Sequence, residues 1–295
     1  LDHLVHHSVI ATVMAQKLHT QLVPRPFFSA CVDGCMEKGR DLSLGGAKYN
    51  IGPVLTGIGL AVVANSLAVI KKLVFEEKIV TRQQLNDALN ANWAGYESLR
   101  AKAMAVPKYG NDNDEVDAIA VRISDHYYYV AREYKDIFGS PFVTAFMGIS
   151  NYIPTGRVVG ATPCGRKAGQ PLAEGVSPFA GSDVATPLSA MRSSAKINHD
   201  LHSGGTLLNL RLNGELLESR RGRNNLGALI RAYFALGAFH VQFNTVSNET
   251  LREAQAHREL YKDLLVRVAG YSAQFVNLSP EMQEAIIVRN AHAEL

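Results

Sequence analysis

The second half of the sequence alternates short apolar runs with segments of helical character, and this order constrains the fold more than any other feature. Three runs have the length and composition of strands, at residues 206–212, 240–246 and 264–268. Helices are expected between them, over about 224–237 and 249–262. Strands that alternate with helices are typical of α/β proteins, so we predict an α/β fold.

The rest of the chain is predicted to be mainly helical, with one further strand. Helices are expected in five places, at residues 8–22, 55–77, 81–93, 114–137 and 279–292. Thr81 and Gln84 have the spacing of a capping box, which marks where the third of these helices begins. Residues 142–147 have the composition of a buried strand. Residues 156–187, rich in glycine, proline, alanine and serine, are expected to form a long ordered loop.

Composition and charge exclude several classes of function. Apolar residues make up 47% of the chain and charged residues 19%, which is enough apolar material for a buried core. The net charge of +3 is too small to indicate nucleic acid or an anionic membrane as a partner. The longest apolar stretch, 54–70, is shorter than a membrane span and is interrupted by Asn65 and Ser66. We therefore expect a globular protein with neither partner.

Cysteine usage and the start of the chain bear on location. The three cysteines, Cys31, Cys35 and Cys164, are too few for a disulfide framework and fit a reducing interior, which predicts a cytoplasmic location. Neither they nor the ten histidines have the spacing of a metal site. The first residue is Leu1 and no signal peptide follows. The sequence is therefore expected to be a fragment, a processed chain or one piece of a split enzyme.

One glycine near the C-terminus interrupts an otherwise apolar segment. Gly270 follows the strand candidate 264–268 and lies between Ala269 and Tyr271. From these residues alone we expect a turn or bulge glycine with a positive φ angle. Its spacing by itself indicates no chemistry.

The surroundings of Gly270 resemble a known family. Residues 267–273 (RVAGYSA), followed by a short terminal helix, resemble the signature of the glycyl radical enzymes. Further segments resemble parts of the same family in the same order, at residues 45–50, 65–68, 70–75, 160–169 and 240–244. The overall resemblance is to pyruvate formate-lyase-like enzymes, and nearest to their glycerol- and diol-dehydratase-like branch. Cys164 departs from the pattern, since many relatives carry Asp or Asn there, and we expect it to be a turn residue.

The resemblance implies a particular architecture. Enzymes of this family have a ten-stranded α/β barrel of two parallel half-sheets wrapped by helices, with a glycine loop and a cysteine loop meeting inside. This chain would then supply half of that barrel: residues 1–237 would form the C-terminal part of the barrel domain, and residues 238–295 the glycyl radical domain.

The resemblance also implies that Gly270 holds the radical. A radical at a glycine Cα is delocalised between the amide nitrogen and the carbonyl, and no side chain opposes the planar geometry. Residues that would support the loop are Arg267, Val268, Ala269, Tyr271 and Ser272. Apolar neighbours that would keep water and oxygen away are Val266, Val268, Phe275 and Val276. Oxygen should cleave the chain at Gly270 if the radical is exposed.

The rest of the implied site is less complete in this sequence. The cysteine that takes over the radical is expected before Leu1, with Cys35 as the alternative. The strand at 142–147 resembles the family strand beside the substrate, although its aromatic residues also fit plain core positions. The candidate pocket residues are Phe142, Phe146 and Tyr152.

The implied function is hydrogen-atom-transfer catalysis with the radical stored on Gly270, through lyase or dehydratase chemistry on a small molecule. Alternatives within the family are the addition of a hydrocarbon to fumarate, as in benzylsuccinate or alkylsuccinate synthesis, and decarboxylation of an arylacetate. Outside catalysis, the chain could be an accessory radical-bearing subunit that completes another protein, or a structural relative without a radical.

The resemblance implies partners as well. No bound cofactor is expected, because the radical is a modification installed by an activating enzyme that uses S-adenosylmethionine and a 4Fe–4S cluster. That enzyme must reach Gly270, so we expect the C-terminal domain to swing outward. A homodimer, or association with the N-terminal half of the enzyme, is expected. The protein should be sensitive to oxygen and work anaerobically.

Overall fold

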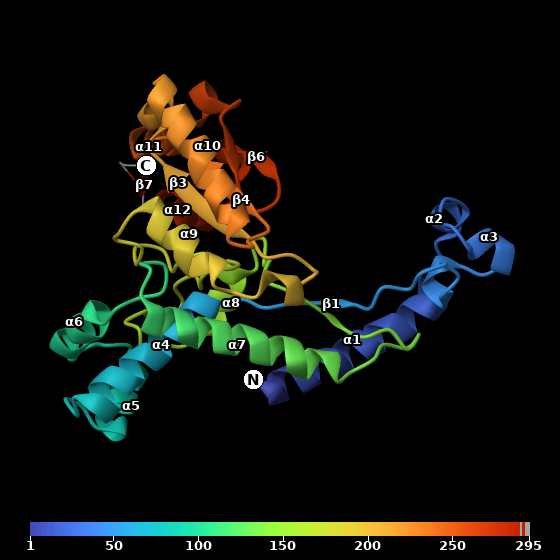
Figure 1. Ribbon diagram of the computed structural model, residues 1–295, viewed down its shortest axis with the longest axis horizontal. Coiled ribbons are helices and arrows are strands. Elements are labelled where there is room, and N and C mark those ends of the chain that lie inside the picture. Colours follow the sequence, from blue (N-terminus) through green and yellow to red (C-terminus); the bar gives the residue numbers. More distant parts are fainter. Residues whose placement is uncertain (290, 293–295) are drawn as a thin grey trace. The chain divides into compact units, whose positions relative to one another are not determined.

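The computed structural model of the protein describes residues 1–289, 291 and 292 (Figure 1). Contacts divide the chain into two compact units. The smaller unit comprises residues 1–56, 125–145 and 201–204, and the larger one comprises 57–124, 146–200 and 205 onward. The predicted domain boundary after residue 237 stays a prediction.

The smaller unit is mainly helical and contains one parallel strand pair. Its elements are α1 (Asp2–Leu22), α2 (Pro26–Ala30), α3 (Cys35–Lys38), the 3-10 helix η1 (Leu42–Leu44), β1 (Val54–Thr56), β2 (Val143–Ala145) and the C-terminal part of α7 (Asp114–Arg132). β1 and β2 are parallel, with Val54 opposite Val143. In the loop between η1 and β1, a Cβ on Gly46 would lie 1.9 Å from the carbonyl oxygen of Arg40, so this position requires glycine.

The larger unit contains the N-terminal part of α7 and the remaining elements, including the first two residues of the 3-10 helix η3 (His199–Leu201). Its other helices are α4 (Leu60–Val69), the π-helix η2 (Ile70–Glu76), α5 (Arg82–Asn90), α6 (Glu97–Ala105), α8 (Tyr152–Val158), α9 (Pro187–Ala195), η4 (Gly214–Leu217), α10 (Arg220–Ala235), α11 (Asn248–Ala256), η5 (Arg258–Tyr261), η6 (Phe275–Asn277) and α12 (Pro280–Ile287). Its strands are β3 (Leu208–Leu212), β4 (Val241–Asn244), β5 (Leu265–Arg267), β6 (Ser272–Gln274) and β7 (Ala291–His292).

A parallel sheet of order β4–β3–β7 organises the larger unit (Figure 1). Every residue of β3 is buried. Because side chains alternate along a strand, its leucines share one face, whereas Asn209 and Arg211 share the other. Gln242 and Asn244 of β4 lie opposite these two residues in the register and therefore face the same way. The parallel strands and intervening helices confirm the predicted α/β class.

Side-chain caps explain where several helices begin. The predicted capping box of Thr81 and Gln84 is present at the start of α5. Ser247 accepts a hydrogen bond from the Thr250 amide at the start of α11, and Ser279 accepts one from the Met282 amide at the start of α12.

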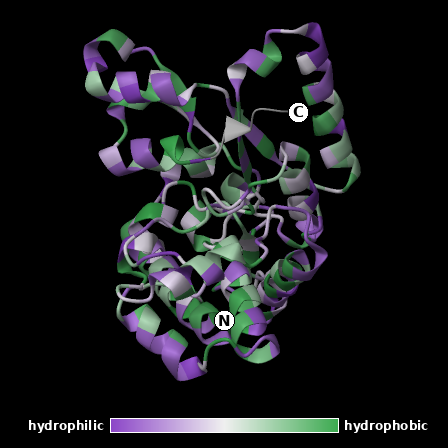
Figure 2. Cartoon of the chain, turned by 90° about the vertical axis from the view of Figure 1, so that its left-hand side faces the viewer, coloured by the Kyte–Doolittle hydropathy of each residue, from purple (hydrophilic) through white to green (hydrophobic). Residues whose placement is uncertain are grey.

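Most helices carry hydrophilic as well as hydrophobic residues (Figure 2). Among the described residues, none of the helices combines the length and the apolar character needed to cross a bilayer.

Several predicted helix boundaries are wrong. The helix expected from residue 55 begins only at Leu60, because β1 occupies 54–56 and Gly59 has a φ of +85°, outside the helical region. The helix expected from 114 ends at Arg132. The terminal helix ends at Ile287, and residues 291–292 pair with β3 instead. The helices α2, α3, α6, α8 and α9 were not predicted.

Candidate functional site

The segment around Gly270 forms the tip of an antiparallel hairpin in the larger unit. β5 pairs with β6, with Val266 opposite Ala273, and the Val268 amide donates to the Tyr271 carbonyl at 2.9 Å. Gly270 has a φ of +76°, as the turn-glycine expectation required. A Cβ added to it would meet no described heavy atom within 4 Å. The tip is therefore both shaped for glycine and open on one side.

The two sides of the hairpin differ in burial. Gly270, Tyr271 and Ser272 are exposed, whereas Val268 and Ala269 are buried. The four apolar flanking residues are all buried, in a cluster with α11 and α12: Val266, Val268, Phe275 and Val276. The flanks therefore anchor the hairpin in the core, but they do not cover the Cα of Gly270.

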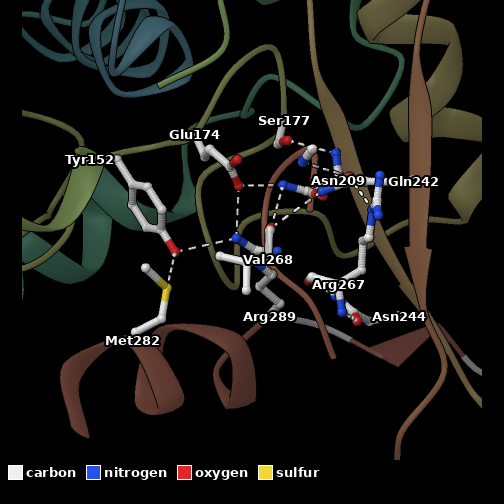
Figure 3. Close-up of polar contacts among 11 residues, drawn as sticks. Tyr152, Glu174, Ser177, Asn209, Gln242, Asn244, Arg267, Val268, Met282 and Arg289 are labelled. Carbon is white, nitrogen blue, oxygen red and sulfur yellow. Dashed lines mark hydrogen bonds and ion pairs between the residues drawn. The ribbon is translucent and has the colours of Figure 1, made fainter. Parts of the chain in front are cut away.

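Two amide side chains on β4 hold the hairpin (Figure 3). Asn244 bonds both backbone groups of Arg267, donating to its carbonyl at 2.6 Å and accepting from its amide at 2.7 Å. Gln242 Oε1 accepts from the Gly270 amide at 3.0 Å and from Arg267 Nε at 3.1 Å. Gln242 Nε2 donates to the Val268 carbonyl at 3.2 Å. Side chains, rather than a continuous strand ladder, thus position the glycine.

A second set of polar groups continues from Gln242 into the unit (Figure 3). Gln242 donates to Asn209 on β3, and Asn209 in turn donates to the Glu174 carboxylate. Arg289 donates to Glu174 Oε2 at 2.8 Å and to the Tyr152 hydroxyl at 3.3 Å. The network links the backbone of Gly270 to a buried ion pair.

This ion pair lies on the wall of a cavity of about 820 Å³ in the same unit. Tyr152, Cys164, Glu174, Asn209 and Arg289 all line it. Its size falls within the range of small-molecule sites, and most of its wall is apolar. The cavity is therefore large enough to hold a small organic molecule.

The carboxyl of Glu174 is perturbed by its surroundings. Burial raises its pKa from 4.5 to about 7, although Arg289 and Asn209 favour the ionised form. Between pH 4.5 and about 7, the Glu174 carboxyl is therefore mainly protonated in the folded protein and mainly ionised in the unfolded chain. The contribution of Glu174 to the free energy of unfolding is therefore complete below pH 4.5 and is lost as the pH rises from 4.5 to about 7.

We expect this loss to appear in a comparison with the Glu174→Gln variant, which cannot ionise at this position. Between about pH 5 and about pH 7.5, the unfolding free energy of the wild type should fall by about 2 kcal/mol relative to that of the variant. Urea unfolding of both proteins at the two pH values measures this change. A difference that stays constant with pH contradicts the raised pKa.

Replacing Gln242 by methionine should loosen the hairpin tip, because the Gly270 amide loses its acceptor and the Val268 carbonyl loses its nearer donor. Losing a buried hydrogen bond costs about 1–3 kcal/mol, so hydrogen exchange of the Gly270 amide should accelerate about tenfold or more. Exchange followed by mass spectrometry over residues 266–275 measures the effect. Gln83→Met, at an exposed position on α5, is the matched control. Unchanged exchange over 266–275 in Gln242→Met shows that Gln242 does not hold the tip.

Of the three residues predicted for the substrate pocket, one lines the cavity and two do not. Tyr152 lines the cavity, and its hydroxyl lies 3.9 Å from Met282 Sδ. Phe142 and Phe146 are buried and do not line it. Phe146 pairs with Thr206 through an isolated parallel bridge. Their role in a pocket stays a prediction.

Sequence reasoning missed the polar residues that hold the hairpin. Gln242 and Asn244 stand two apart in one strand, and Asn209 and Arg211 stand two apart in another. Two polar residues at this spacing in an apolar run indicate a polar face on a buried strand, so the signal was available. Glu174 and Arg289 gave no such signal, because one lies in a loop and the other follows α12.

One acidic cluster could suggest a metal. Among the described residues, Asp112, Asp114 and Asp117 bring carboxylate oxygens within 4.8 Å of one another. Lys196 Nζ bonds all three, at 2.9, 2.7 and 2.7 Å, and Arg192 pairs with Asp112. These two cations offset most of the charge of the three carboxylates, and the ion pairs join the start of α7 to the end of α9.

Comparisons with known proteins match most of the chain. Residues 1–156 match the sequence model of the pyruvate formate lyase-like family, and residues 172–276 match that of the glycine radical domain. Trans-4-hydroxy-L-proline dehydratase of Clostridioides difficile is 37% identical over 290 residues, 98% of this chain and 36% of the relative. The probable dehydratase YbiW of Escherichia coli K12 is 40% identical over 294 residues, 96% of this chain and 36% of the relative.

A solved structure agrees with these matches. The glycerol-bound B12-independent glycerol dehydratase of Clostridium butyricum superposes with a TM-score of 0.96 at 40% identity, over 99% of this chain and 37% of that one. The predicted fold class, part of an α/β barrel of this type with a C-terminal radical domain, is confirmed. This chain spans just over a third of the length of these relatives.

Proposed function

The chain belongs to the pyruvate formate lyase-like family of glycyl radical enzymes, and we propose that Gly270 is the residue on which its radical is stored. The hairpin tip supports this assignment. Gly270 combines a backbone conformation suited to glycine with a Cα open on one side, inside the segment 267–273 that resembles the family signature. Arg267, Val268, Ala269, Tyr271 and Ser272 form the loop around it.

The proposed chemistry is a reversible hydrogen-atom transfer. An activating enzyme that uses S-adenosylmethionine and a 4Fe–4S cluster would supply a radical that removes one hydrogen atom from the Gly270 Cα. The residue keeps its second α-hydrogen and one unpaired electron. In this chain Gln242 would keep the amide nitrogen of Gly270 in place while the Cα becomes planar, since it accepts the Gly270 N–H at 3.0 Å.

We propose lyase or dehydratase activity on a small molecule for the whole protein, in line with the dehydratases that this chain resembles. The cysteine that exchanges a hydrogen atom with Gly270 is proposed to lie outside these 295 residues. No described sulfur lies within 4 Å of the position that a Cβ on Gly270 would take. The partners proposed are the activating enzyme, a small-molecule substrate, and a second copy or an N-terminal half that covers the open glycine. A reducing cytoplasm is the proposed location, in keeping with three free cysteines.

The experiment that tests the assignment is anaerobic activation followed by electron paramagnetic resonance. We expect a doublet from the one remaining α-hydrogen, and cleavage at Gly270 when air is admitted, observed by mass spectrometry. The absence of both signals after treatment with an activase that works on a related enzyme would remove Gly270 from this role.

A further inference from the structure

Three hydrogen bonds run in one direction from the Gly270 amide to the carboxylate of Glu174 (Figure 3). The Gly270 N–H donates to Gln242 Oε1 at 3.0 Å. Gln242 Nε2 donates to Asn209 Oδ1, and Asn209 Nδ2 donates to Glu174 Oε2. Gln242, Asn209 and Glu174 are all buried, so bulk water does not compete freely for these bonds. Both side-chain amides in this series therefore have the oxygen toward Gly270 and the nitrogen toward Glu174.

We propose that Glu174 is a positioning residue whose charge sets the strength of the hydrogen bond at the Gly270 amide, acting through Asn209 and Gln242. A hydrogen bond to a charged acceptor is stronger than one to a neutral acceptor, and it polarises the amide that donates it. An ionised Glu174 therefore makes Asn209 Oδ1 a better acceptor. Gln242 Oε1 in turn becomes a better acceptor for the Gly270 N–H. Each bond strengthens the next by about 10–30%, so the effect is attenuated along the series but still reaches Gly270.

The same hydrogen bond bears on the radical, a step that rests on the proposed function. In a glycyl radical the amide nitrogen donates electron density to the Cα. A stronger acceptor on the Gly270 N–H makes that nitrogen a better donor, so more of the unpaired spin moves from the Cα onto the nitrogen. The ionised form of Glu174 thus stabilises the radical more than the neutral form does.

Glu174 changes its charge near neutral pH, because burial raises its pKa to about 7. Two ionisable groups face it. Arg289 donates to its carboxylate at 2.8 Å, and the Tyr152 hydroxyl accepts from Arg289 at 3.3 Å. Burial raises the pKa of Tyr152, so the hydroxyl stays neutral in this range, and an arginine keeps its charge. Of these three groups, Glu174 alone titrates near pH 7.

Two further ionisable groups lie at the other end of the series. Arg267 Nε donates to the same oxygen of Gln242 at 3.1 Å, and its charge is constant. His240 directly precedes β4, and burial, with the charge of Arg267, lowers its pKa below 6.5. An effect of His240 on the hairpin therefore occurs at a lower pH than an effect of Glu174, and it persists when Glu174 is replaced.

Nuclear magnetic resonance of the unactivated chain tests the hydrogen-bond series without a radical. In the wild type, the proton resonance of the Gly270 amide should move downfield as the pH rises from about 5 to about 8, with a midpoint near pH 7. In Glu174→Gln, which keeps an acceptor oxygen but cannot ionise, the movement near pH 7 should disappear. Glu253→Gln, at an exposed carboxylate on α11, is the matched control and should keep it.

A third variant tests whether the effect passes through the side-chain amides. Asn209→Leu breaks the series in its middle, so the Gly270 resonance should no longer move while the Glu174 carboxyl still titrates. Should this variant fail to fold, the comparison of the wild type with Glu174→Gln decides alone. A Gly270 resonance that does not move, or that moves equally in the wild type and Glu174→Gln, overturns the proposal.

The splitting of the radical doublet tests the effect on the radical. After anaerobic activation at about pH 8, the splitting from the remaining α-hydrogen of Gly270 should be larger in Glu174→Gln than in the wild type, because more spin stays on the Cα. Glu253→Gln should show the wild-type splitting. Equal splittings in all three proteins overturn the influence of Glu174 on the radical. A wild type without any doublet counts against the proposed function instead, and the amide titration then still decides whether Glu174 acts on the Gly270 N–H.

Discussion

Replacing Gly270 by alanine should abolish the radical and leave the chain folded. The added methyl group meets no described atom within 4 Å, so packing does not oppose it. Alanine at a φ of +76° costs about 1–2 kcal/mol, a modest loss of stability. The chemistry should be lost entirely, because a side chain on the Cα crowds the planar radical. After anaerobic activation, electron paramagnetic resonance should show no signal, and air should no longer cleave the chain at residue 270.

Gly169→Ala provides a matched control. Gly169 has a φ of +79° and open space around its Cα, so alanine there carries the same conformational cost at a site away from the hairpin. The control should lose similar stability and keep the full doublet. A doublet of wild-type intensity in Gly270→Ala would place the radical on another residue.

Replacing Arg166 by methionine should have the largest effect on stability. The Arg166 side chain is 1% exposed, and its guanidinium donates to backbone carbonyl groups across one loop region. These carbonyls belong to Gly156, Val159, Gly160, Gln170 and Pro171. Losing this set of charge-assisted bonds should lower the unfolding free energy by about 4 kcal/mol, as measured in urea.

Lys167→Met is the control for this change, because the neighbouring lysine side chain is exposed and its loss should be nearly neutral. Arg166→Lys should fall between the two, since an ammonium keeps the charge but cannot reach every carbonyl. Equal midpoints for Arg166→Met and Lys167→Met would show that the guanidinium does not hold the loop.

Local signals in the sequence predicted the elements that depend on local physics. The capping box at Thr81 and Gln84 marked a helix start because a side chain bonds a nearby amide. The strands β3, β4 and β5 were found from short apolar runs. Helix ends were missed where distant contacts decide them. The chain leaves α12 to pair with β3, a residue pairing about 80 positions away that no local pattern contains.

The same distinction between local and distant contacts separates the parts of the candidate site that the sequence predicted from those that it did not. The family resemblance drew attention to Gly270, and the turn conformation followed from the residue type. The partners of its backbone could not be assigned, because the bond from the Gly270 amide to Gln242 spans 28 positions. The raised pKa of Glu174 arises from burial, which depends on how loops and helices close around it. Sequence thus located the glycine, whereas the tertiary structure defined its support.

The amide side chains of Gln242 and Asn244 on β4 have a consequence for where this chain can vary in length. Gln242 and Asn244 hold the hairpin through side-chain bonds, and β5 pairs with β6 rather than with β4. The position of Gly270 is therefore determined by Gln242 and Asn244, whose side chains lie on the same face of β4. It does not depend on the length of the connection over residues 245–264. Insertions in the exposed stretch at 257–260 should be tolerated without displacing the glycine, which makes that stretch suitable for a fluorescent or affinity label.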